Sequence, residues 1–176
     1  MPSNLDKLVA CLKFFGLQPS MSNYQWRFMA QKIAFLAKAL GMNIGYDFTI
    51  YVAGPYSRDL NCDYYPNEVK SRIDALETTY ELTLSDITAL DRIKGCQGLL
   101  ENQSLLEATS TAVYLMKQSP DQSEDRLFVS LKLLKPHLSE SDRVIGISKA
   151  KELLFRSAYL SDKLQREMDE WDRLES

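Results

Sequence analysis

Histidine is almost missing from this chain: it occurs once in 176 residues, at His137. A single imidazole excludes a metal site built on a pair of histidines and leaves no second imidazole for proton relay. His137 follows Pro136 at the end of an expected helix, where we expect it to face the helix terminus or an interface. Histidine chemistry is therefore not expected.

Cysteine is also scarce. Cys11, Cys62 and Cys96 are odd in number, far apart and without a Cys-x-x-Cys pair, so neither a disulfide framework nor a zinc site is expected. This pattern is typical of a reducing compartment. The first residues carry Asp6 and Lys13, which makes a poor signal peptide. We therefore expect a cytoplasmic protein.

Long apolar runs are missing too. The richest apolar segment, Trp26 to Leu40, contains Arg27, Lys32 and Lys38, and it is too short and too charged to cross a bilayer. The sequence predicts a core helix here and no membrane partner.

An excess of positive charge is likewise absent. The net charge of −3 gives no general attraction to nucleic acid or to anionic membranes. The one tight cationic cluster is Lys70-Ser71-Arg72. It offers few of the several Lys and Arg contacts that phosphate binding requires, so its simplest interpretation is a solvated helix face.

Acidic residues and glycines form no recognisable catalytic or ligand site. Asp59, Asp63 and Glu68 lack the alternating ladder of a calcium loop and read as a solvated loop with local caps. Residues Gly95 to Gly98 lack the Gly-Lys-Ser/Thr ending of a phosphate loop and follow a helix. A cysteine nucleophile would need His137 folded against it. We expect no catalytic residue, no metal and no cofactor, and hence no enzyme.

Helical periodicity is what the chain has in abundance. Ser3 and Asp6 make a capping box, and apolar residues at helical spacing predict a first helix over about 4–15. The stripe from Trp26 to Leu40 predicts a central helix that ends at Gly41. Beyond Ser85 the pattern is helical to the C-terminus.

One segment interrupts the helices with an alternating pattern. Between Tyr46 and Val52 the even-numbered residues are apolar, which predicts a strand over about 46–53 that ends at Gly54-Pro55. A lone strand leaves its backbone groups unpaired. The alternating segment Thr79 to Leu84 is the predicted partner, strand 79–84. Two short helices, about 58–63 and 66–77, would connect the strands.

The fold class that follows is mainly α (α+β): a multi-helix bundle with a small antiparallel two-stranded β element, for which a winged-helix-like arrangement is one form. We expect a single domain over 1–156 and a C-terminal helix over 157–176 that either docks on this domain or binds a partner. The apolar stripe of that helix consists of Leu160, Leu164, Met168, Trp171 and Leu174.

The segment KIAFLAKALGMNIGYDFTIYVAGPYSRDL resembles the hallmark segment of the YwgA-like family of uncharacterised archaeal and bacterial proteins. The matching features are Lys32 in an aromatic-rich helix, Gly45-Tyr46, and Gly54-Pro55-Tyr56-Ser57. The segment is more distantly similar to the Panacea domain of SocA-like antitoxins. With LEATSTAVYLMKQS and LKLLKPHLSESD, the resemblance covers about residues 25–155. It departs from the family pattern at Val52-Ala53 and at the interruption from Cys62 to Pro66.

The resemblance implies an antitoxin-like regulatory module. Tyrosines concentrate around the same segment, and tyrosine suits interfaces because it joins apolar area to a hydrogen-bonding tip. We expect a non-enzymatic regulatory or protein-interaction module with an unknown protein partner, and a homo-oligomer that forms through the C-terminal helix. The expected partner-binding residues are Tyr51, Gly54, Pro55, Tyr56 and Trp171.

The alternative is a winged-helix DNA-binding transcriptional regulator. Residues Tyr80 to Thr83 resemble the wing strand of such proteins, and the predicted helices precede it. Lys70 and Arg72 would contact phosphates in that case.

Overall fold

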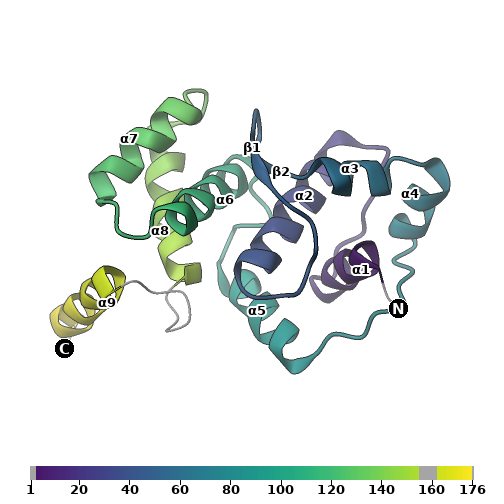
Figure 1. Cartoon of the computed structure of the whole chain (residues 1–176), viewed down its shortest axis with the longest axis horizontal. Helices are drawn as coiled ribbons and strands as arrows, with labels where there is room; N and C mark the ends of the chain where they lie inside the picture. The colour runs from purple at the N-terminus through teal and green to yellow at the C-terminus, as the bar shows by residue number, and fades with distance from the viewer. Residues whose placement is uncertain (1–2, 155–161, 176) are drawn as a thin grey trace. The chain divides into compact units, whose positions relative to one another are not determined.

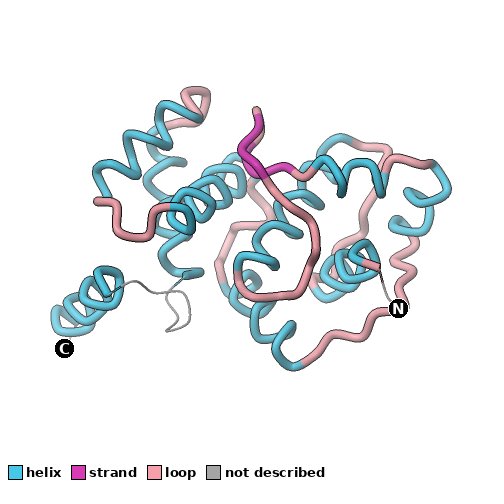
Figure 2. Tube along the Cα trace, viewed as in Figure 1, coloured by secondary structure: helices cyan, strands magenta, loops and turns pink. Residues whose placement is uncertain are grey.

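The computed structural model describes residues 3–154 and 162–175. These residues form nine helices and one two-stranded antiparallel sheet (Figures 1 and 2). The predicted fold class, mainly α with a small β element, is confirmed. The chain divides into two compact units, residues 1–103 and 104–176, and each is described by itself. The predicted boundary at 156–157 lies outside the described residues and stays a prediction.

The first unit contains five helices and both strands. In chain order they are α1 (Asn4–Phe14), α2 (Tyr24–Ala39), β1 (Thr49–Tyr51), β2 (Gly54–Tyr56), α3 (Arg58–Tyr64), α4 (Asn67–Asp74) and α5 (Leu84–Gly95).

Helix α2 is the centre of the first unit. Every residue from Ala30 to Ala37 is buried, and the helix packs against α1, α5 and β2. Its alanines let these neighbours approach closely, while Ile33 and Leu36 fill the space between them. The prediction that this helix is central is confirmed. Because the stretch from Ala30 to Ala37 is covered on all sides, its polar residues Gln31 and Lys32 must find partners inside the protein.

The two strands form one hairpin. Thr49 pairs with Tyr56, Ile50 with Pro55 and Tyr51 with Gly54, so only Val52 and Ala53 lie in the turn. Gly54 has a φ of 99°, a left-handed conformation that glycine adopts without steric cost. Closing a loop of this length costs far less entropy than pairing with a distant strand. The observed strand β1 is shorter than the predicted 46–53, because Val52 turns the chain.

The predicted partner strand at 79–84 is wrong. Residues 77–83 form no strand, and Leu84 begins α5. Thr83 caps this helix in a capping box with Asp86, whose carboxylate also accepts a hydrogen bond from the Tyr80 hydroxyl at 2.6 Å. The Thr78 hydroxyl donates to the Asp6 carbonyl at 2.7 Å. Local capping and this contact with α1 account for the alternating pattern that suggested a strand.

The second unit contains four helices: α6 (Gln103–Gln118), α7 (Glu124–Leu134), α8 (Glu140–Leu154) and α9 (Asp162–Glu175). Helix α7 packs on α8. Helix α8 meets α6 at Gly146, where an added Cβ would lie 2.6 Å from Ala108 Cβ and 3.0 Å from the Ala108 carbonyl carbon. This glycine is therefore required for the two helices to approach so closely.

Helix α9 carries part of the predicted apolar stripe. Trp171 is 60% exposed and Leu174 is 83% exposed, whereas Leu160 lies outside the described residues. Lys151 of α8 contacts α9 through Glu167, at 2.6 Å. Among the described residues, no helix is both long and apolar enough to cross a membrane.

Candidate functional site

A cavity of about 270 Å³ lies in the first unit, between the first half of α2, the β1–β2 hairpin and α3. Aromatic side chains dominate its lining, with Gln31 and Lys32 at the side of α2 and Val52 and Gly54 at the side of the hairpin. The aromatic residues are Tyr24, Phe28, Tyr51, Tyr56 and Tyr64. We call this space the hairpin cavity.

Gln31 joins α2 to the start of α3. Its side-chain oxygen accepts a hydrogen bond from the Ser57 amide at 2.8 Å, and its side-chain nitrogen donates to the Ser57 carbonyl at 2.9 Å. The same nitrogen lies 3.4 Å from the Tyr64 hydroxyl oxygen. Ser57 is buried, so one glutamine satisfies two backbone groups that have no access to water.

Lys32 holds the second strand of the hairpin. Its Nζ donates to the Pro55 carbonyl at 2.8 Å and lies 4.7 Å from the centre of the Phe28 ring. Pro55 has no amide hydrogen, and alternate residues of an antiparallel strand direct their carbonyls away from the partner strand. The buried ammonium therefore receives a backbone acceptor and an aromatic face, which together offset part of its desolvation.

The rim of the hairpin cavity is a pair of stacked tyrosines. The rings of Tyr51 and Tyr56 are diagonal neighbours across the hairpin, with centroids 5.3 Å apart and planes inclined by 29°. Tyr51 is 63% exposed and Val52 at the turn is 77% exposed. Burial raises the pKa of Tyr56 and of Tyr64 above the ordinary tyrosine value. These phenols therefore stay neutral at physiological pH and present a hydroxyl to the cavity.

Arg27 lies on the lining beside these rings and is partly exposed. Its Nη1 donates to the carbonyls of Met21 and Ser22, at 3.0 Å and 2.8 Å. Its Nε and Nη2 make no hydrogen bond within the described part of the chain. The guanidinium is thus fixed through one nitrogen and keeps the edge formed by the other two.

The structure brings three of the five predicted partner-binding residues to one place. Tyr51, Gly54 and Tyr56 line the hairpin cavity, and Pro55 lies behind it with its carbonyl on Lys32. Trp171 is in the second unit, on α9. Whether these residues bind a partner stays a prediction.

Sequence reasoning missed Gln31, Arg27 and Tyr24 as parts of this cavity. A signal for Gln31 was present: it stands beside Lys32 in a helix whose other residues nearby are apolar on every face. Two adjacent polar residues in a fully buried helix indicate an internal hydrogen-bonded joint.

Lys70 and Arg72, proposed above as phosphate contacts, are engaged within the first unit. The Lys70 ammonium lies 5.1 Å from the centre of the Tyr65 ring. Arg72 lies 3.9 Å from the Asp6 carboxylate and 4.0 Å from the Glu77 carboxylate. These carboxylates offset the positive charge that the cluster would present to a phosphate.

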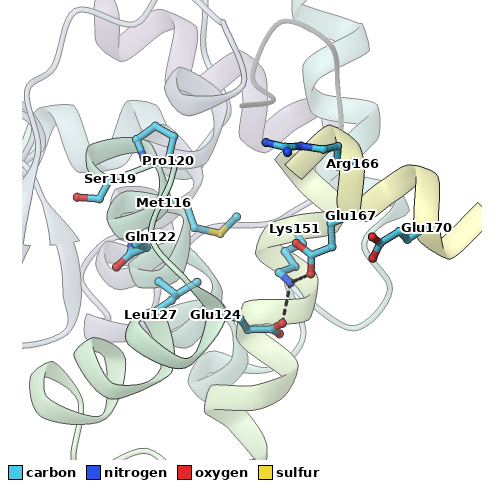
Figure 3. Close-up of a pocket in the computed structure, with 10 residues that line it drawn as sticks. All are labelled: Met116, Ser119, Pro120, Gln122, Glu124, Leu127, Lys151, Arg166, Glu167 and Glu170. Carbon is cyan, nitrogen blue, oxygen red and sulfur yellow. Dashed lines mark hydrogen bonds and ion pairs between the residues drawn. The ribbon is translucent and has the colours of Figure 1, made fainter. Parts of the chain in front are cut away.

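A second cavity, of about 370 Å³, lies in the second unit (Figure 3). Met116 and Leu127 supply its apolar part, while α9 contributes three charged residues, Arg166 among them. Lys151 pairs here with Glu124 at 3.0 Å and with Glu167 at 2.6 Å. Burial lowers the pKa of Lys151, but the hydrogen bonds to both glutamates outweigh burial and raise it. The charges that surround this cavity are largely paired with one another.

His137 takes part in a small charged cluster of the second unit. Its Nε2 lies 2.9 Å from Glu107 Oε1, and the buried Lys135 Nζ lies 3.5 Å from the same oxygen. Burial lowers the pKa of Lys135, and Glu107 opposes that shift. The sequence placed His137 at a helix end but gave no sign of Glu107 as its partner.

The cysteines allow a direct check of the structure. Cys62 is exposed, whereas Cys11 and Cys96 are buried, and burial raises the pKa of Cys11 to about 12. Because the thiolate is the reactive form, one thiol is expected to react quickly with Ellman's reagent at neutral pH. The other two should react only after denaturation. Cys62→Ser should remove the fast phase, and two fast thiols in the native protein would contradict the structure.

Asp59, Asp63 and Glu68 belong to no cluster of metal-ligand side chains among the described residues. Asp63 accepts a hydrogen bond from the Tyr46 hydroxyl at 2.6 Å, and no group of three or more His, Cys, Asp or Glu residues in the described ranges is arranged to hold a metal ion.

In comparisons with protein-family models, curated proteins and solved structures, this chain matches none of them, so the family resemblance stays a prediction.

Proposed function

We propose that this protein is a regulatory protein-binding module without catalytic activity of its own, and that it binds its partner at the hairpin cavity. One observation carries the proposal: the hairpin presents exposed side chains, while its backbone is held in place by buried hydrogen bonds. Tyr51 and Val52 face solvent, while Gln31 and Lys32 attach the backbone behind them to the buried helix α2.

This combination suits recognition. Aromatic side chains with neutral hydroxyls provide large contact area together with hydrogen bonding, and such residues are common hot spots of interfaces. A base that is already ordered lowers the entropy that binding must overcome. The antitoxin-like resemblance of the same segment agrees with a regulatory role, and the exposed thiol of Cys62 agrees with a cytoplasmic location.

The proposal is tested by capture of partners from a native extract on the immobilised protein. The double variant Tyr51→Ala/Tyr56→Ala should retain the partner at least about tenfold less well, as expected when an aromatic hot spot is removed. The matched control is Tyr65→Ala, because Tyr65 is 70% exposed but does not line the cavity. Equal capture by the wild type and the double variant would overturn the proposal, once the captured protein is confirmed to bind in purified form.

Self-association through α9 is a separate part of the proposal. Trp171 and Leu174 are exposed there, and a helix with an exposed apolar stripe is a common element of helix-pair interfaces. DNA binding has less support, because Arg72 lies beside two carboxylates and the wing strand expected at 79–84 does not form.

A further inference from the structure

The hairpin cavity carries a charge of one sign. Its charged lining residues in the described part of the chain are Arg27 and Lys32, and none of the lining residues there is an aspartate or a glutamate. The protein as a whole carries a net charge of −3, so the positive lining of this cavity is opposite in sign to the chain.

The two cations of the lining have different roles. Lys32 is 2% exposed and donates to the Pro55 carbonyl. It therefore contributes electrostatic attraction to an anionic ligand, without a hydrogen bond to it. Arg27 is partly exposed and uses only Nη1 within the protein. Its Nε–Nη2 edge has the fork geometry that binds a carboxylate through two parallel hydrogen bonds.

The size of the cavity limits what enters it. About 270 Å³ is below the range of roughly 300–1,000 Å³ that holds complete drug-sized ligands. The walls are the faces and edges of aromatic rings, with Tyr24 and Phe28 on one side and the Tyr51–Tyr56 stack on the other. One aromatic side chain of a ligand fits both the small volume and the aromatic walls. Pairs of aromatic rings are stabilised by more than the apolar area that they bury.

We propose that the hairpin cavity binds an acidic peptide segment of a protein partner. One aromatic side chain of the peptide lies between the Tyr24–Phe28 pair and the Tyr51–Tyr56 stack, and a neighbouring carboxylate binds Arg27. This inference rests on the proposed function and names the chemistry of the partner. The exposed turn at Val52 extends the contact beyond the cavity, which a free aromatic acid could not use.

Three fluorescein-labelled peptides test the charge and the ring separately, by fluorescence polarisation at low salt. They are Glu-Asp-Phe-Glu-Asp, the same peptide with alanine for phenylalanine, and the charge-reversed Lys-Lys-Phe-Lys-Lys, each with the label at its N-terminus and an amide at its C-terminus. The acidic aromatic peptide should bind at least about tenfold more tightly than either of the others, and added salt should weaken it. Equal binding of all three peptides, or no binding, overturns the inference.

Two variants locate the binding. Arg27→Gln should weaken the acidic aromatic peptide about tenfold, which corresponds to the loss of a charge-assisted hydrogen bond, whereas Arg58→Gln, outside the lining, should change it less than about twofold. Tyr24→Ala provides a second check, because Tyr24 is 58% exposed and its truncation should leave the fold intact. If neither Arg27→Gln nor Tyr24→Ala weakens the peptide, the inference is wrong.

The inference and the proposed function fail in different ways. If capture of the partner depends on Tyr51 and Tyr56 but not on Arg27, the proposed function stands and the inference of an acidic peptide is wrong. If the tyrosine variants do not affect capture either, both the proposed function and the inference are wrong.

Discussion

Gly146→Ala is expected to destabilise the second unit by about 2–3 kcal/mol, the cost of overpacking a rigid core position. The new Cβ would lie 2.6 Å from Ala108 Cβ and 3.1 Å from the Thr109 amide nitrogen. Because backbone atoms are among these neighbours, α6 and α8 must separate to admit the methyl group. Hydrogen exchange measured by mass spectrometry over these two helices, together with the urea midpoint, gives the size of the effect.

Gly95→Ala is the matched control for this substitution. A Cβ added at Gly95 meets no heavy atom within 4 Å, so the change should leave stability unaltered or raise it slightly, by up to about 1 kcal/mol. Ala108→Gly in the Gly146→Ala background should restore part of the loss, because it removes the nearest atom but not the backbone contacts. If the two single alanine variants unfold at the same urea concentration, the close crossing of α6 and α8 is wrong.

Gln31→Ala is expected to destabilise the first unit by about 1–3 kcal/mol, the cost of one buried backbone group left without a partner. That group is the amide of Ser57, which is 1% exposed, since the Ser57 carbonyl keeps its hydrogen bond from the Asn61 amide at 3.1 Å. The loss should appear as a lower urea midpoint and as faster hydrogen exchange at the start of α3. Gln25→Ala, at an exposed position in the first turn of the same helix, should change the free energy of unfolding by less than about 0.5 kcal/mol.

Gln31→Glu separates the acceptor from the donor. Its carboxylate would still accept from the Ser57 amide, but it would stand against the Ser57 carbonyl oxygen, which now accepts a hydrogen bond at 2.9 Å. Burial and this oxygen both raise the pKa of the introduced carboxyl group, so the folded state favours the protonated form. Stability should therefore be higher near pH 5 than near pH 7 and fall as the pH rises. A variant that is equally stable at both would show that Ser57 does not need the donor.

The helical body was readable from the sequence because periodicity and capping act locally. Ser3 with Asp6, and the apolar residues from Trp26 to Leu40, predicted α1 and α2 closely, and the buried stretch of α2 explains why. Strand pairing was not readable in the same way. Thr79 to Leu84 alternates like a strand, yet Thr83 and Asp86 use their side chains to start a helix.

The candidate site was readable only in part. Gly54-Pro55 was predicted to end a strand, and Tyr51 and Tyr56 were predicted as partner-binding residues, which stays a prediction. The contacts that fix this corner are between Gln31 and Ser57 and between Lys32 and Pro55, which are 26 and 23 residues apart. Contacts of that range depend on how α2 and the hairpin fold together, and no local pattern specifies them.

The hairpin is attached to the body through its second strand and not through its turn. Pro55 and Ser57 are fixed to α2 by hydrogen bonds, whereas Val52, in the turn, is 77% exposed. Substitutions at this exposed turn position should change the surface of the hairpin with little effect on the free energy of unfolding. The turn can therefore vary in sequence more freely than the second strand, whose backbone is held by the buried helix.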